Sequence, residues 1–155
     1  MGDRDFDDAA ALPWDLVDVV VPNEAEARAL LQGALAGSER RTAGGLADAL
    51  AVDLGVSVVV VTLGEAGCLA HFEGGTWRYP AEKAEAVDAT GAGDAFMAAF
   101  AARLVGGAPV PDAIEAAQSA AAWAVRHPGG HEAMPGAAQV DRQAAGAAAG
   151  GGQRC

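Results

Sequence analysis

Runs of β-branched residues alternate along this chain with segments in which apolar residues recur at helical spacing. The run over 56–62 is rich in valine and has no charged residue, which is typical of a buried central strand of a parallel sheet. A shorter apolar run over 16–21 predicts a second strand. Segments 68–72 and 76–79 flank a Glu-Gly-Gly turn and predict a hairpin.

Helical spacing of alanine and leucine predicts four helices around these strands. The first follows Asn23, a favourable cap residue, and runs to about Gln32, and the second covers 46–54. Two more, over 92–105 and 111–126, are joined by a short turn with glycine and proline. Strands and helices that alternate around a buried parallel strand predict an α/β fold, here a three-layer α/β/α sandwich with a mostly parallel sheet.

The two ends of the chain differ in composition from its middle. Residues 1–15 are acidic and irregular, whereas 16–137 carry all the predicted strands and helices and form the expected domain. After 137 the sequence is rich in Ala, Gly and Gln, a composition with little apolar surface to bury. We therefore expect a disordered tail over 138–155.

Composition excludes several classes of function. The net charge of −11 argues against a nucleic-acid or anionic-membrane surface. Lys83 is the single lysine and no G-K-[ST] motif occurs, so a Walker-type phosphate loop is excluded. Cys68 and Cys155 are too few and too scattered for a disulfide framework or a zinc site. Without a signal peptide or an apolar run of membrane-spanning length, we expect a cytoplasmic location.

Two glycines and a carboxylate lie where the loop before 92–105 becomes a helix. A helix N-terminus presents unpaired N–H groups and a positive dipole end, and glycine lets an anion approach the backbone closely. Asp94 at such a site suggests a base that removes a proton from a hydroxyl beside a phosphoryl group. The alternative is that Asp94 only caps the helix, and a short glycine motif alone does not decide between the two.

The longer string around Asp94 carries a family resemblance. Asp88-Ala-Thr-Gly-Ala-Gly-Asp-Ala-Phe resembles the second signature of the ribokinase-like (PfkB) carbohydrate kinases, with Ala where that pattern usually has its first Thr. Asn23-Glu-Ala-Glu resembles the family's N-x-x-E element, and 62–67 resembles its T-L-G-x-x-G element. The three matches occur in the family's order over about 16–135. Family members are roughly twice as long, so the resemblance implies the C-terminal half, a partial ribokinase-like fold.

For the signature, the resemblance implies ATP-dependent phosphorylation of a sugar hydroxyl. Asp94 matches the catalytic base that deprotonates the acceptor hydroxyl. The amides of Gly91, Ala92, Gly93 and Asp94 match an anion hole for the migrating phosphoryl charge. The flank 83–88 is most similar to the ribokinase branch of the family, which favours D-ribose as the acceptor and ribose 5-phosphate as the product.

The resemblance also implies ATP as the co-substrate, Mg²⁺, and an activating K⁺. Asp88 and Thr90 match positions that help to hold K⁺, with the loop 126–132 completing that site. Asn23 and Glu26 match an element that organises Mg²⁺ through water. The residues that the resemblance assigns to ATP are Asn23, Thr62, Gly64, Gly67 and Gln118.

Each of these elements also has a purely structural explanation, and the residues alone do not decide between structure and function. An Asn followed three positions later by Glu, as at Asn23 and Glu26, is a near copy of a capping box. A strand followed by a turn that needs glycine explains Thr62 and Gly64 equally well. Gln118 is either a residue near the adenine or a polar residue on a helix surface.

Two other hypotheses stand beside a kinase that acts on a small-molecule sugar and ATP. The first is a nucleotide-binding module without catalysis, because the resemblance omits the half of the family that binds the sugar and forms the lid. Such a module would form a homodimer or pair with a separate N-terminal half. The second is a fragment that does not fold stably.

Overall fold

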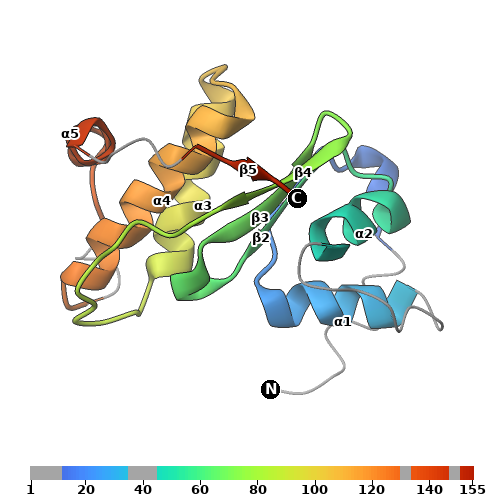
Figure 1. Cartoon of the computed structure of the whole chain (residues 1–155), viewed down its shortest axis with the longest axis horizontal. Helices are drawn as coiled ribbons and strands as arrows, with labels where there is room; N and C mark the ends of the chain where they lie inside the picture. The colour runs from blue at the N-terminus through green and yellow to red at the C-terminus, as the bar shows by residue number, and fades with distance from the viewer. Residues whose placement is uncertain (1–11, 35–44, 130–133, 147–150) are drawn as a thin grey trace. The chain divides into compact units, whose positions relative to one another are not determined.

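Contacts within the computed structural model divide the chain into two compact units. The first unit combines the chain up to Tyr79 with Gln153–Cys155. The second unit runs from Pro80 to Gly152. The residues that the structure describes are 12–34, 45–129, 134–146 and 151–155 (Figure 1).

The first unit contains a mixed sheet whose strands lie in chain order: β1 (Val19–Val20), β2 (Val58–Thr62), β3 (Cys68–Phe72), β4 (Gly75–Tyr79) and β5 (Gln153–Arg154). β1 pairs with β2 in parallel, and each later pair of neighbours is antiparallel. The described part of the sheet therefore has one parallel pair, where the sequence favoured a mostly parallel sheet. The reason is the hairpin and the returning β5, both of which add antiparallel neighbours.

Two helices of the first unit, α1 (Glu24–Ala34) and α2 (Gly45–Leu54), pack against each other and against β2 (Figure 1). Leu31 of α1 and Leu50 of α2 join a buried cluster with alternate valines of β2. Val60, on the opposite face of that strand, is also fully buried. Burial on both faces explains why β2 reads in the sequence as an uninterrupted apolar run.

A tight hairpin joins β3 and β4. Phe72 lies opposite Gly75 in the register, which leaves a two-residue turn at Glu73 and Gly74. Both turn residues have positive φ, +49° and +69°, as a type I′ turn requires. The Phe72 and Trp77 rings stack with centroids 4.1 Å apart. The predicted hairpin is thus present, with the turn one residue shorter than expected.

The second unit contains three helices in its described residues, α3 (Ala92–Val105), α4 (Val110–Arg126) and α5 (Ala137–Gly146). α3 packs against α4, and α4 packs against α5. Their shared core consists mainly of alanines with Val140, and small side chains allow the helix axes to approach closely. No described helix is both long enough and apolar enough to cross a bilayer.

Three segments differ from the sequence-based expectations. The strand expected over 16–21 is shorter, because a 3-10 helix, η3 (Trp14–Leu16), ends just before β1. The tail expected to be disordered over 138–155 contains most of α5 and all of β5. Val140 anchors α5 in the alanine-rich core. β5 pairs with the edge of β4, where the Arg154 guanidinium lies over the Trp77 ring.

Candidate active site

The signature segment forms the start of α3. Gly91 is the N-cap residue and has φ +81°, a left-handed conformation that favours glycine. No side chain caps this helix. Asp94 lies three residues after the cap, in the first turn, and is exposed. The carboxylate is therefore presented to solvent at the helix start and does not act as the N-cap group.

The amides of this first turn differ in how far they are engaged within the fold. The geometry of a helix leaves its first N–H groups without intrahelical acceptors. The Ala92 N–H faces the Ala89 carbonyl at 3.3 Å, so it is partly engaged within the loop. A Cβ added at Gly93 would meet no atom within 4 Å, and Gly93 has no positive φ. Neither crowding nor backbone conformation requires glycine there, whereas close approach of a ligand would.

The Asp88 carboxylate ties together the loop before α3 and the loop after α4. Its Oδ1 accepts the N–H of Thr90 at 2.9 Å, and its Oδ2 accepts the N–H of Gly129 at 3.4 Å. Hydrogen bonds from the side chain and backbone of Thr90, and then from Gly129, hold the pKa of Asp88 below its ordinary value. The residues that were expected to hold K⁺ thus form an ionised, hydrogen-bonded loop.

In the first unit, Asn23 and Glu26 form a reciprocal pair at the start of α1. The Asn23 N–H donates to Glu26 Oε2 and the Glu26 N–H donates to Asn23 Oδ1, both at 2.9 Å. This is the geometry of a capping box. Asn23 also lies beside Thr62 in an isolated parallel bridge, and the Thr62 N–H donates to the Pro22 carbonyl. The ends of β1 and β2 therefore bring Asn23 and Thr62 together.

The turn after β2 depends on two glycines with positive φ. Gly64 has φ +59° and begins a 3-10 helix, η4 (Gly64–Ala66), and Gly67 has φ +92°. The Gly67 N–H donates to the Gly64 carbonyl at 3.0 Å. The turn itself therefore explains both glycines, and a Cβ at Gly64 would point into open space. Gln118 lies half-buried on α4 and belongs to the second unit.

The described residues contain no cluster of three or more His, Cys, Asp or Glu side chains that could hold a metal ion. The predicted site residues divide between the two units. The first unit brings together Asn23, Glu26 and Thr62, with Gly64 two residues further along. The second unit brings Asp88 and Thr90 close to Gly129, at the start of the helix that carries Asp94.

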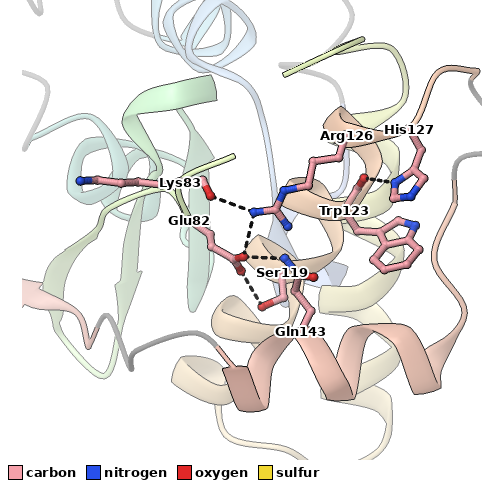
Figure 2. A network of polar contacts seen from close by, with 7 residues as sticks. All are labelled: Glu82, Lys83, Ser119, Trp123, Arg126, His127 and Gln143. Carbon is pink, nitrogen blue, oxygen red and sulfur yellow. Dashed lines mark hydrogen bonds and ion pairs between the residues drawn. The ribbon is translucent and has the colours of Figure 1, made fainter. Parts of the chain in front are cut away.

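A polar network in the second unit was not predicted from the sequence. Glu82 accepts hydrogen bonds from Ser119, Gln143 and Arg126, and Arg126 also donates to the Lys83 carbonyl (Figure 2). One signal was available, because Ser119 and Arg126 are seven residues apart and so share a face of α4. Both interrupt an otherwise alanine-rich helix. The partner Glu82 lies in an irregular segment, where periodicity gives no information.

The chain is similar to carbohydrate kinases. The profile of the pfkB family carbohydrate kinases matches residues 2–137. A 2-dehydro-3-deoxygalactonokinase from Haloferax volcanii is 42% identical over 110 residues, covering 71% of this chain and 33% of that protein. A ribokinase from Staphylococcus aureus is 33% identical over 131 residues, covering 82% of this chain and 42% of that protein.

The fold is similar as well. The structure of Arabidopsis thaliana ribokinase complexed with ribose and ATP matches with a TM-score of 0.73 and 32% identity, covering 84% of this chain and 42% of that chain. The chain therefore has part of the ribokinase-like α/β fold, and it spans less than half the length of these relatives. With the match over 2–137, these similarities show that the chain belongs to the pfkB family of carbohydrate kinases.

Proposed function

We propose that this chain carries the nucleotide-binding and proton-abstracting part of an ATP-dependent sugar kinase. The observation that supports this most is the start of α3, where an exposed carboxylate at Asp94 follows a left-handed glycine cap at Gly91. A base and a set of backbone donors then lie within one helical turn. A phosphoryl transfer needs both, one for the acceptor hydroxyl and the other for the charge on the migrating group.

The proposed reaction is an in-line displacement. Asp94 takes the proton of a sugar hydroxyl as that oxygen forms a bond to the γ-phosphorus of ATP, and the bond to the bridging oxygen breaks to release ADP. The amides of Gly91, Ala92, Gly93 and Asp94 face the charge on the transferred group, and each such donor contributes on the order of a few kcal/mol. The partial engagement of Ala92 makes Gly93 and Asp94 the better donors.

Asn23 and Glu26 fit a hydrated Mg²⁺ held mainly by the phosphates. Each gives one side-chain oxygen to the capping box, and a carboxylate has further lone pairs to accept hydrogen bonds from metal-bound water. Mg²⁺ usually keeps several waters and few protein ligands, so one amide oxygen and one carboxylate can be sufficient. When bound, Mg²⁺ would neutralise charge on the phosphates. The other residues that we propose to contact ATP are Thr62, which lies beside Asn23, and Gly64, Gly67 and Gln118.

Asp88 and Thr90 fit a monovalent cation such as K⁺. The carboxylate is held in its charged form, and the left-handed Gly129, with φ +102°, bends the adjoining loop toward it. Carbonyls of such a bent loop suit a large monovalent ion. Residues 130–133, part of the loop predicted to complete this site, lie outside the described residues.

D-ribose is the acceptor that the flank 83–88 favours, and the similarity to ribokinases supports it. The similarity to a 2-dehydro-3-deoxygalactonokinase supports a sugar acid as a second acceptor to test. The alternative function is nucleotide binding without catalysis, as a homodimer or paired with a separate N-terminal half. The observation that favours it is coverage, because the chain matches only 33% to 42% of these relatives.

A coupled ADP-release assay on the purified chain separates the two functions. It contains MgATP and KCl with D-ribose or 2-dehydro-3-deoxygalactonate, and a thermal melt with MgATP runs in parallel. Sugar-dependent ADP release supports the kinase and names its acceptor. A rise in melting temperature with MgATP and no ADP release supports the binding module. Neither effect, from a chain that melts sharply, would refute both.

A further inference from the structure

The Glu82 carboxylate accepts hydrogen bonds from side chains of two helices. Its Oε1 accepts from Gln143 Nε2 of α5 at 2.6 Å, and its Oε2 accepts from Ser119 Oγ of α4 at 3.2 Å. Figure 2 shows these groups converging on the carboxylate. The Glu82 side chain is 20% exposed, and a carboxylate removed this far from water needs such donors. The irregular segment before the signature is thereby attached to both helices.

Arg126 connects this carboxylate to the backbone that follows it. Its Nη2 lies 3.5 Å from Glu82 Oε1 and donates to the Lys83 carbonyl at 2.8 Å. One guanidinium group thus contacts two consecutive residues of the same segment. Because Arg126 is the last residue of α4, this contact fixes the segment at the end of the helix from which the Gly129 loop departs.

Further contacts continue along the same helix end. The N–H groups of Val87 and Asp88 donate to the Val125 carbonyl at 2.7 Å and 3.1 Å. The Asp88 carboxylate then accepts the N–H of Gly129. The final turns of α4 and the loop after it therefore contact four residues of the segment before α3, which are Glu82, Lys83, Val87 and Asp88. Loss of the contacts at Glu82 would leave the segment held only from Val87 onward, by the Val125 carbonyl and by the Asp88 carboxylate.

We propose that Glu82, acting through Arg126, is a positioning residue that aligns Asp88 and the signature loop with the end of α4. The proposal rests on the function given above, because its consequence is the correct placement of the cation and phosphate site at 88–94. Gln143 extends the alignment to α5, so the helix near the C-terminus contributes to the order of the signature loop without reaching the reacting atoms.

Hydrogen–deuterium exchange tests the alignment directly on the full chain without nucleotide or sugar. Glu82→Gln keeps the size of the side chain and removes its charge, and Glu85→Gln makes the same change at an exposed position of the same segment. We expect Glu82→Gln to speed exchange over 84–91 about tenfold, the factor that corresponds to about 1.4 kcal/mol of lost local stability. In Glu82→Gln, exchange over 96–104 of α3 should stay at the wild-type rate. In Glu85→Gln, exchange over 84–91 should also stay at the wild-type rate.

Arg126→Gln should reproduce the effect, and the double variant should add little, because the two residues act as one unit. In the kinase assay, Glu82→Gln should raise the KCl concentration for half-maximal rate severalfold more than it changes the KM for ATP. The proposal is overturned if exchange over 84–91 is the same in Glu82→Gln and Glu85→Gln, or if exchange over α3 rises equally. A wild-type chain without kinase activity would refute the proposed function, and exchange would still decide the role of Glu82.

Discussion

Asp88 accepts the backbone N–H of Gly129 at 3.4 Å, although 41 residues separate the two along the chain. Its other oxygen accepts the N–H of Thr90, two residues further on. One half-buried carboxylate therefore joins the loop that begins α3 to the loop that follows α4. An ionised carboxylate is the better acceptor for both bonds, so the geometry of this part of the site depends on the protonation of Asp88.

We expect the Asp88 carboxylate to make stability depend on pH in the acid range. The hydrogen bonds from Thr90 and Gly129 hold its pKa below the ordinary value of 3.8. The folded state then binds fewer protons than the unfolded state between the two pKa values, so stability rises with pH there. The contribution is complete above the ordinary pKa and is lost as the pH falls through the folded pKa.

Thermal unfolding of the wild type and of Asp88→Asn, from about pH 6 down to about pH 3, measures this contribution. The wild type should melt at the higher temperature near neutral pH, and the difference should shrink toward the acid end. A difference that stays constant over the whole range would show that the charge on Asp88 has no part in it.

Glu26 can be tested as a cap residue and as a metal-organising residue separately. Glu26→Ala removes the hydrogen bond to the Asn23 N–H, and we expect it to lower the unfolding free energy by about 1 kcal/mol. Glu26→Gln can keep that hydrogen bond and should cost only a few tenths of a kcal/mol from the lost interaction with the helix dipole.

The Mg²⁺ dependence then distinguishes the two roles. If Glu26 orders water on the metal, Glu26→Gln should raise the Mg²⁺ concentration needed for half of the ATP-induced rise in melting temperature. Glu24→Gln is the matched control, because Glu24 lies in the same helical turn and pairs with Arg28 on the surface. Equal Mg²⁺ dependence in both Gln variants would assign Glu26 to the cap alone.

Gly91 and Gly93 should respond differently to alanine. Gly91 has φ +81°, so Gly91→Ala places a Cβ in the left-handed region and should destabilise the fold by about 1–2 kcal/mol. Gly93 lies in helical backbone with open space around its Cα, so Gly93→Ala should leave stability unchanged or raise it by up to about 1 kcal/mol.

Although Gly93→Ala should not destabilise the fold, we expect it to impair the binding of MgATP. A methyl group there would stand where the phosphate is proposed to approach, so Gly93→Ala should abolish the MgATP-induced rise in melting temperature while urea unfolding stays cooperative. Undiminished stabilisation by MgATP in Gly93→Ala would mean that no phosphate group comes close to this turn.

Local sequence patterns predicted the elements that are set by their own residues. The helix expected over 92–105 is observed as Ala92–Val105, because a glycine cap begins it and a glycine pair ends it. The hairpin turn was expected from its glycines, although it is one residue shorter than predicted and Glu73, with φ +49°, takes one of its two positions. The reciprocal bonds of Asn23 and Glu26 were one of two outcomes that the same spacing allowed.

Features that depend on distant parts of the chain could not be predicted from local patterns. β5 is a strand only because Gln153 and Arg154 meet the free edge of β4, and two residues carry no periodicity. The carboxylate of Glu82 has its partners 37, 44 and 61 residues away. Met97 of α3 is 43% exposed, whereas Ala95 and Ala99 of the same helix pack in the alanine-rich core, and only the contact with α4 decides which side chains are covered.

The most direct test of the account compares Asp94→Asn with Asp112→Asn in the ADP-release assay. Both are exposed carboxylates three residues after the N-cap of their helices, Gly91 for α3 and Pro109 for α4. If Asp94 is the base, Asp94→Asn should lower sugar-dependent turnover by about 10²- to 10⁴-fold, and Asp112→Asn should keep the wild-type rate. Both variants should retain cooperative unfolding and stabilisation by MgATP. Equal turnover in the two variants, or a folded wild type without any turnover, would contradict the account.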